Sequence, residues 1–210
     1  MKKIYIVRHG ETDNNKNGLI QGRGIHASLN ETGRMQAEAL GSFFQGRRLD
    51  AIAVSSLQRT HQTARPVAEM KQLPLHEYAD LDEMDYGVLE GSSVYDTNEY
   101  MNQLKEQWEE GHTDTPISGG ESPQQVFDRA TGRIGELIRS DNTKQYWMFV
   151  LHGRLIRILL SGWLYGDLRH MQKIQHGNGA INILQYDNGT FEPLLLHYTA
   201  HLNYNPETTA

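Results

Sequence analysis

Short apolar runs alternate with helix-like segments along most of this chain, and that alternation limits the possible folds. The runs at 4–7, 51–54 and 146–151 have the length and composition of buried strands, and a shorter one is expected around 75–78. Strands separated by helices favour parallel pairing with cover on both faces of the sheet. We therefore expect an α/β fold, a three-layer α/β/α sandwich with a mostly parallel central sheet.

Capping residues mark two of the helices. Asn30 has the residue type and position of an N-cap, and Gly46 is placed to end the helix that Asn30 begins. Ser122 has the pattern of a capping box, because Pro123 stands at the first helical position and Gln125 stands three residues after Ser122. Both helices are therefore expected to begin at defined residues.

The other segments are defined by their apolar pattern. A helix is expected over about 57–70, where Pro66 should kink or shorten it. The segment 155–164 is apolar nearly all round, which predicts a buried helix. Two final strand-like runs, 181–186 and 191–197, flank an Asn-Gly pair, which predicts a β-hairpin.

The composition excludes several classes of protein. The chain has 210 residues, of which 38% are hydrophobic and 22% charged, as is typical of a soluble globular protein. We expect one domain over 1–210, with an irregular helical insertion at about 84–120 over one edge of the sheet. The absence of cysteine excludes disulfides, zinc–thiolate sites and a thiol nucleophile. A net charge of −6 argues against nucleic acid or a membrane as partner, and we expect a cytoplasmic protein.

Two histidines directly follow strand-like runs, and each stands beside a glycine and an arginine. Arg8-His9-Gly10 follows the first run, and His152-Gly153-Arg154 follows the run at 146–151. Open α/β sheets bind ligands at the edge where parallel strands end. Two imidazoles and at least one guanidinium at this edge indicate a site for an anion, with one ring free to act as a nucleophile.

A phosphate monoester is an anion that suits these groups. Arg8, Arg59 and His152 can stabilise the charge that a phosphoryl group carries during transfer. His9 can attack phosphorus through a ring nitrogen and form a phosphohistidine. Glu83, after the third expected strand, is the best-placed acid to protonate the leaving group and then to activate water.

Eight short motifs also follow one another along residues 3–186. They are Arg8-His9-Gly10-Glu11-Thr12 with Asn15, Gln21-Gly22, Leu29-Asn30 with Gly33 and Gln36-Ala37, Ser55-Ser56-Leu57-Gln58-Arg59 with Gln62-Thr63-Ala64, Leu81 with Glu83, Tyr86-Gly87 with Glu90-Gly91, Gly120-Glu121-Ser122, and His152-Gly153. With these motifs the chain resembles the histidine phosphatase superfamily, in its phosphoglycerate mutase-like branch, and is more similar to the small-molecule phosphatases than to the mutases.

The resemblance implies a metal-independent phosphomonoester hydrolase that needs no cofactor and acts on a small molecule; it leaves the oligomeric state open. The catalytic set that it implies is His9, Glu83, Arg8, Arg59 and His152. The residues expected to contact phosphate or substrate are Asn15, Gln21, Gly22 and Gly153.

The chain departs from the family pattern in ways that bear on the substrate. It lacks the arginine pair with which the mutases grip a carboxylate, and it lacks their lysines after the Gly91 position and in the C-terminal tail. The loop after Gln21-Gly22, which usually runs Asp-x-Pro-Leu in the family, here reads Gly24-Ile25-His26-Ala27-Ser28-Leu29. The insertion at 84–120 carries eight acids against Lys105 alone. An acidic cover repels a second anion, so we expect an ester whose distal part is neutral or cationic.

Two other functions stay open at this point. A cofactor-dependent phosphoglycerate mutase would return the phosphoryl group to the substrate instead of to water. A non-catalytic binder would hold a phosphorylated ligand without reaction. Release of inorganic phosphate without isomerisation would exclude the first, and turnover would exclude the second.

Several further polar residues are interpreted as structural, in solvent or in ion pairs. They are Arg23, Arg34, Arg154, His197 and His201. His197 and His201 have the i, i+4 spacing of metal ligands, but they lie in strand-like sequence without an acidic partner nearby. The segment 176–179 is expected to be a plain turn, with a loop near the site as the alternative.

Overall fold

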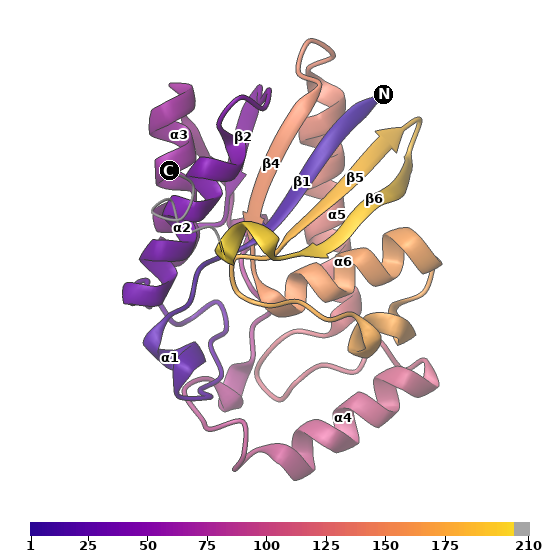
Figure 1. The fold of residues 1–210 in the computed structure, drawn as a ribbon. Helices are drawn as coiled ribbons and strands as arrows, with labels where there is room; N and C mark the ends of the chain where they lie inside the picture. The colour runs from indigo at the N-terminus through magenta and orange to yellow at the C-terminus, as the bar shows by residue number, and fades with distance from the viewer. Residues whose placement is uncertain (204–210) are drawn as a thin grey trace.

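The computed structural model describes residues 1–203, in which a six-stranded sheet lies between helices (Figure 1). The strands are β1 (Lys2–Arg8), β2 (Ala51–Val54), β3 (Leu75–Glu77), β4 (Tyr146–Leu151), β5 (Ile181–Asp187) and β6 (Thr190–Tyr198). Their order is β3-β2-β4-β1-β5-β6. The first four in this order are parallel, and β5 and β6 continue the sheet antiparallel. The expected α/β fold with a mostly parallel sheet is confirmed.

Helices cover both faces of this sheet. They are α1 (Asp13–Lys16), α2 (Glu31–Phe44), α3 (Gln58–Lys71), α4 (Asn98–Glu110), α5 (Pro123–Ser140) and α6 (Gly153–Tyr165). Shorter 3₁₀ segments lie at Ala79–Leu81, Gly87–Leu89, Leu168–Lys173 and Ala200–Asn203. In Figure 1, α2 and α3 lie on one side of the sheet and α5 and α6 on the other, while α4 crosses below the strand ends.

The two-residue repeat of β1 explains the two layers of helices. Successive side chains of a strand point to opposite faces of the sheet. Ile4 and Ile6 belong to the core that includes residues of α5 and α6, whereas Tyr5 and Val7 belong to the core that includes residues of α2 and α3. Because both faces of the central strands are buried, their sequences are continuously apolar.

The capping and turn signals lie where the sequence predicts them. The Asn30 side chain accepts a hydrogen bond from the Gly33 N–H at 2.9 Å and begins α2. Ser122 and the Gln125 side chain cap the start of α5 reciprocally. In the β5–β6 hairpin Asn188 and Gly189 have φ of 46° and 93°, the left-handed pair that a two-residue turn between twisted strands requires.

The expectation that Pro66 shortens its helix is wrong. α3 continues through Pro66 and ends at Lys71, where Gln72 adopts a left-handed conformation. A proline within a helix removes one backbone hydrogen bond. Val67 and Ala68, directly after it, are buried in the core, and their burial offsets that loss.

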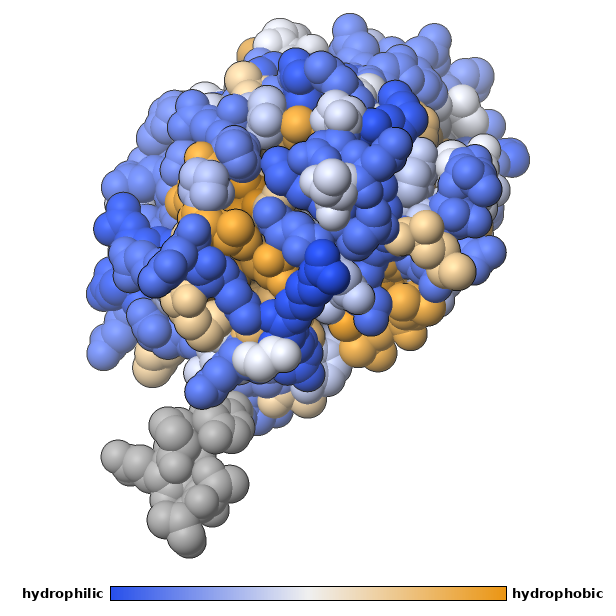
Figure 2. Space-filling model, turned by 90° about the horizontal axis from the view of Figure 1, so that it is seen from above, coloured by the Kyte–Doolittle hydropathy of each residue, from blue (hydrophilic) through white to orange (hydrophobic). Residues whose placement is uncertain are grey.

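The register of the parallel strands brings distant segments to one edge. Arg8 of β1 lies opposite Leu151 of β4, and Val54 of β2 lies opposite Val150, so the residues that follow these strands emerge together. They are His9, Ser55 and His152. Figure 2 views the opposite end of the molecule, which is mostly hydrophilic with scattered hydrophobic patches.

Candidate active site

A cavity of about 270 Å³ lies at the edge where β1 and β4 end. Its volume is near the lower end of the range for small-molecule sites. Its lining residues are Arg8, His9, Asn15, Ile20, Gln21, Glu83, Tyr86, Val94, Gly153, Arg154 and Arg157. Three guanidiniums and one carboxylate line it, so the cavity is positive although the whole protein is acidic. The cavity therefore suits an anionic small molecule.

His9 lies in this cavity as a neutral ring with a defined tautomer. Its Nδ1 lies 2.7 Å from the Gly10 carbonyl oxygen, which only accepts, so Nδ1 carries the proton. Burial, followed by the charges of Arg59 and Arg8, holds the pKa of His9 well below its usual value. Nε2 therefore keeps its lone pair.

His152 lies next to His9, with its ring centroid 5.2 Å from that of His9, but both of its ring nitrogens are engaged below the cavity. Arg59 Nε donates to His152 Nδ1 at 3.2 Å, so Nε2 carries the proton and donates to Ser55 Oγ at 2.8 Å. Burial, followed by the charge of Arg59, lowers the pKa of His152 well below its usual value. His152 thus forms the floor beneath His9, outside the cavity lining.

Arg59 is also buried beneath the cavity. Besides His152 it donates to the carbonyl oxygens of Ile25 at 2.6 Å and Gly22 at 3.3 Å, so it ties the 22–25 loop to α3. Burial lowers the pKa of Arg59 to about 10. The positive charge of Arg59 acts on the cavity by lowering the pKa of His9.

The Arg8 side chain lines the cavity and packs against Gly153. A Cβ atom on Gly153 would lie 3.1 Å from the Arg8 guanidinium carbon, so the absence of a side chain there makes room for it. Arg8 donates to the carbonyl oxygen of His176, and its buried Nε has no hydrogen-bond partner among the described residues. That N–H is available to a ligand.

The 176–179 segment contains the expected turn at 178–179, and it also lies next to the site, as in the alternative interpretation. Besides the contact of Arg8 with His176, the Asn178 side chain donates to the His9 carbonyl oxygen and to Asn15 Oδ1, both at 3.1 Å. The repeated Gly and Asn residues gave only a turn signal. No local pattern connects this segment to β1, which lies about 170 residues earlier in the chain.

Glu83 is fixed by three backbone N–H groups. Its Oε1 accepts from Met84 and Leu155, both at 2.9 Å, and its Oε2 accepts from Arg154 at 3.0 Å. Two of these donors belong to the first turn of α6, so the carboxylate takes the place that an anion would occupy at that helix terminus. Glu83 therefore lies on the cavity wall in a defined orientation.

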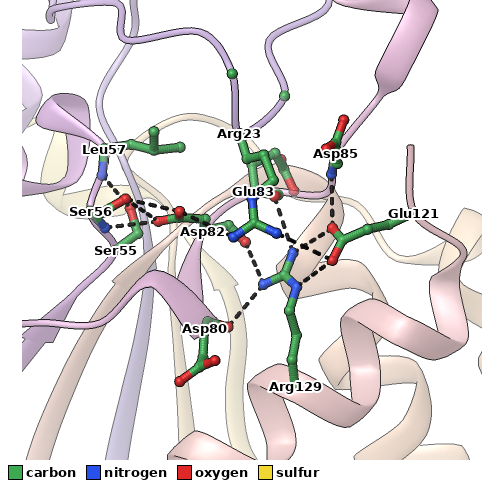
Figure 3. Close-up of polar contacts among 12 residues, drawn as sticks. Arg23, Ser55, Ser56, Leu57, Asp80, Asp82, Glu83, Asp85, Glu121 and Arg129 are labelled. Atoms are coloured by element: carbon green, nitrogen blue, oxygen red, sulfur yellow. Dashed lines mark hydrogen bonds and ion pairs between the residues drawn. The ribbon is translucent and has the colours of Figure 1, made fainter. Parts of the chain in front are cut away.

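A buried network holds the segment that carries Glu83 (Figure 3). Arg129 of α5 donates to the carbonyl oxygens of Asp80, Asp82 and Glu83 and forms a two-pronged pair with Glu121. The Glu121 carboxylate also accepts the Asp85 N–H at 2.9 Å. Thus α5 positions the backbone on both sides of Glu83.

Arg23 and Ser56, both noted in the sequence, also bind to this network. Arg23 lies 3.6 Å from both Asp82 and Glu121, in agreement with its interpretation as an ion-paired residue. Asp82 accepts from the N–H and the hydroxyl of Ser56 at the end of β2. These contacts join the 80–85 segment to the neighbouring strand end.

Of the four residues expected to contact phosphate or substrate, three line the cavity and one does not. The three are Asn15, Gln21 and Gly153. The Gln21 side chain is 9% exposed, and neither of its amide atoms has a hydrogen-bond partner among residues 1–203. Gly22 does not line the cavity. It packs against Glu90, since a Cβ there would lie 1.8 Å from Glu90 Oε1. The orphaned Gln21 amide is a second group available to a ligand.

Sequence reasoning missed the arginines of α6. Arg154, expected in solvent or an ion pair, lines the cavity and donates to the Tyr86 hydroxyl at 3.3 Å and to Gln172 Oε1 at 3.0 Å. Arg157, one turn further, also lines it. Their i, i+3 spacing directly after His152 is the signal that could have revealed them, because it places both on one face of the helix.

The insertion contributes to the cavity, but none of its eight acids lines it. Among the lining residues it supplies Tyr86 and Val94, whereas its acids on α4 and the flanking turns, such as Glu106 and Glu110, are exposed. The expectation of a neutral or cationic substrate stays a prediction without support from the cavity lining, because composition alone did not show which way the acids point.

The remaining histidines noted in the sequence pack structurally. His201 is buried against the rings of Phe43 and Tyr198, and His197 Nε2 accepts the Gly177 N–H at 3.2 Å. Within residues 1–203 no group of three or more His, Cys, Asp or Glu side chains is arranged to hold a metal ion. None of the helices described there has the length and apolar character needed to cross a membrane.

Comparison with known proteins gives a consistent set of matches. The family model for the histidine phosphatase superfamily (branch 1) matches residues 4–199. A probable phosphatase of Schizosaccharomyces pombe is 40% identical over 165 residues, covering 77% of this chain and 73% of that protein. Phosphoserine phosphatase 1 of Hydrogenobacter thermophilus is 29% identical over 202 residues, covering 96% of this chain and 95% of that protein. The solved phosphoserine phosphatase of Entamoeba histolytica, in complex with 3-phosphoglyceric acid, is 27% identical with a TM-score of 0.84, covering 96% and 100%.

Proposed function

This chain belongs to the histidine phosphatase superfamily, and on that premise we propose that it hydrolyses small phosphate monoesters through a phosphohistidine on His9. The family and the named relatives support a phosphatase enzyme. The single observation that carries the intermediate is the state of His9, whose Nδ1–H is held by Gly10 and whose Nε2 is unprotonated at a positive cavity. Such a ring is a nucleophile for an anionic ester.

In the first step, His9 Nε2 forms a bond to phosphorus and the bond from phosphorus to the ester oxygen breaks. The leaving oxygen takes a proton from Glu83. Oε2 suits this role because it accepts one backbone N–H, whereas Oε1 accepts two. A carboxyl oxygen has two lone-pair positions, so Oε2 has one left for the proton.

In the second step, a water molecule gives a proton to Glu83 and its oxygen bonds to phosphorus. The bond from phosphorus to Nε2 breaks, and inorganic phosphate leaves. Glu83 is then protonated and His9 neutral, as at the start. Neither step uses a metal ion or a cofactor.

The transferred group is stabilised by donors without partners in the described structure. Arg8 Nε and the Gln21 amide are buried at the cavity and free to bind phosphoryl oxygens. Arg59 and His152 support the site from below, since Arg59 lowers the pKa of His9 and also holds the His152 ring. Their role in this proposal is to keep His9 neutral and in place.

We also propose that residues 1–210 act as one domain, with 84–120 as its insertion, in the cytoplasm. The support for one domain is the sheet, because β1 pairs with β4 and β5 from the far part of the chain. The support for the compartment is the lack of cysteine, since oxidising compartments favour disulfides.

Rapid quenching tests the intermediate directly. The enzyme is mixed with p-nitrophenyl phosphate, quenched in alkali and digested, and the phosphopeptide is located by mass spectrometry. We expect an acid-labile phosphate on His9, and no label or turnover in His9→Ala. A matched control, His112→Ala at an exposed position on the insertion, should be labelled like the wild type. Label elsewhere, or turnover by His9→Ala, would contradict the proposal.

Leaving-group dependence tests Glu83. Glu83→Gln should lower kcat for an alkyl phosphate by on the order of 10²–10⁴, because an alkoxide needs a proton to leave. The loss should be smaller for p-nitrophenyl phosphate, whose leaving group is stable as an anion. Equal losses for both esters would exclude Glu83 as the acid. Release of inorganic phosphate without isomerisation of a phosphoglycerate excludes the mutase.

A further inference from the structure

Asn178 joins two groups that both lie at the cavity. Its side-chain nitrogen donates to the His9 carbonyl oxygen and to Asn15 Oδ1, each at 3.1 Å. His9 and Asn15 line the cavity, whereas Asn178 lies behind them, outside the lining. An amide nitrogen carries two hydrogens, so these two contacts use both donors of Asn178. The Asn178 side chain can therefore act on the cavity through its two partners.

The Asn15 amide has a defined orientation. Its Oδ1 accepts the backbone N–H of Thr12 at 3.2 Å and the Asn178 nitrogen at 3.1 Å. A backbone N–H only donates, and the His9 carbonyl oxygen only accepts, so Asn178 must present its nitrogen and Asn15 its oxygen. These donors hold Asn15 Oδ1 against the protein, and the Nδ2 group of the same amide is turned the other way.

The Nδ2 group of Asn15 has no partner in the described part of the chain. Among residues 1–203 it makes no hydrogen bond, although Asn15 lines the cavity. An amide nitrogen donates and a phosphoryl oxygen accepts, so Nδ2 suits a phosphate in the cavity. A half-turn of the amide would instead set its oxygen against the phosphate, and two acceptors repel each other. The orientation of this amide therefore determines whether Asn15 attracts or repels a phosphate.

The His9 carbonyl depends less on Asn178 than Asn15 does. It also accepts the backbone N–H of Gly179 at 3.3 Å, and the same N–H lies 3.2 Å from the Arg8 carbonyl oxygen. A change of the Asn178 side chain leaves these backbone contacts in place. The loss of the Asn178 amide should therefore affect Asn15 more than the nucleophile.

We propose that Asn178 is a positioning residue, which fixes the Asn15 amide with its nitrogen toward the reacting phosphate. Asn178 itself does not touch the substrate. This inference rests on the proposed function, since it places that phosphate at His9. Without Asn178 the affinity for phosphate should fall about 3- to 10-fold, which corresponds to the net contribution of one hydrogen bond.

Calorimetry with inorganic phosphate measures this effect without turnover. Asn178→Leu keeps the branched shape of the side chain and removes both donors. We expect the Kd for phosphate to rise about 3- to 10-fold. The KM for p-nitrophenyl phosphate should rise with it, while kcat changes less than about twofold, because an interaction made equally in the ground state and the transition state affects KM alone. Asn178→Ala adds no bulk and should give the same result.

A double-mutant cycle shows whether Asn178 acts through Asn15. Asn15→Ala removes the amide and keeps the hydrogen bond from the residue 15 backbone N–H to Thr12 Oγ1, which caps α1. In this background Asn178→Leu should raise the Kd for phosphate no further. Losses that multiply would overturn the proposal, because Asn178 would then act independently of Asn15.

Asn142→Leu is the matched control. Asn142 is exposed between α5 and β4, and so lies at the end of the sheet opposite the site. The substitution removes the same amide and should keep the wild-type Kd. An equal response of Asn142→Leu and Asn178→Leu, or a wild type that binds no phosphate, would overturn the positioning role.

The two readouts separate the positioning role from the reaction. Turnover with an unchanged Kd in Asn178→Leu would exclude the positioning role and leave the hydrolase. Phosphate binding that Asn178→Leu weakens, in a protein without turnover, would support the positioning role and exclude the hydrolase. A fall in kcat with an unchanged Kd would mean that Asn178 acts on His9 instead, which also contradicts the proposal.

Discussion

At the scale of single residues, the proposed mechanism requires a neutral His9. Burial, Arg59 and Arg8 all lower its pKa, so protonation should limit kcat/KM only well below pH 6.5. Arg59→Gln removes one of these charges, and the pKa of His9 should rise. The acid limb of the pH profile should therefore move to higher pH, and kcat should also fall because the His152 ring and the 22–25 loop lose the guanidinium that holds them.

The pH profile of kcat/KM with one substrate measures this shift, because the ionisation of the substrate is the same for both proteins. Arg65→Gln, an exposed arginine on the same helix, should leave the profile unchanged. A rate loss without a shift would mean that Arg59 acts only by holding His152 and the 22–25 loop.

The sequence could place some of these residues and not others. His9 and Glu83 follow strand-like runs, and such positions meet at one edge of a parallel sheet. The positions of the Arg59 and Arg157 guanidiniums depend on side-chain direction, which the sequence pattern leaves undefined. Arg59 turns inward and donates to carbonyl oxygens, whereas Arg157 lines the cavity.

At the scale of elements, the start of α2 presses directly on the segment that carries His9. A Cβ on Gly33 would lie 2.1 Å from the Glu11 carbonyl oxygen, and a Cβ on Gly10 would lie 2.6 Å from the Gly33 oxygen. Gly33→Ala should therefore push α2 away from this segment, lower the free energy of unfolding by about 1–3 kcal/mol and reduce kcat at least several-fold.

Gly132→Ala is the matched control for Gly33→Ala. Gly132 is exposed within α5, and an added Cβ meets no atom within 4 Å. Alanine there should raise the free energy of unfolding by about 0.5–1 kcal/mol, because glycine is the poorer helix former. Urea unfolding and kcat check both variants, and equal stabilities would show that the contact of α2 with Glu11 is not tight.

Element bounds followed from local signals, whereas the contacts between elements did not. The strands at 51–54 and 146–151 match β2 and β4 to the residue, since apolar runs flanked by turn residues mark both ends. The continuation of α3 through Pro66 depends on core packing beyond it. The place of the 176–179 segment depends on pairing between β1 and β5, which no local rule specifies.

At the scale of the whole molecule, four buried histidines make stability depend on pH. They are His9, His152, His176 and His201. Burial is the largest cause that lowers the pKa of each, for His176 to about 3 and for His201 to about 4. In the unfolded chain their pKa is about 6.5. Below that pH the unfolded state binds more protons, so stability falls as the pH falls.

Each such histidine can contribute up to about 1.4 kcal/mol per pH unit below pH 6.5. We expect the free energy of unfolding, from urea titrations, to drop by several kcal/mol between pH 7.5 and pH 5. His201→Phe should reduce this dependence, and His112→Gln, at an exposed position, should keep it. A free energy of unfolding that is constant over this range would contradict the buried neutral histidines.

The central place of β1 has a consequence for how the chain is made. Its neighbours in the sheet, β4 and β5, begin at Tyr146 and Ile181, so a nascent polypeptide emerging from the ribosome exposes β1 as an unpaired apolar strand until those residues have been made. The carbonyl of His176 that receives Arg8 is made later than most of the chain. Products that stop before β5 should therefore be inert and prone to aggregate, because β1 then lacks a neighbouring strand and Arg8 lacks the His176 carbonyl.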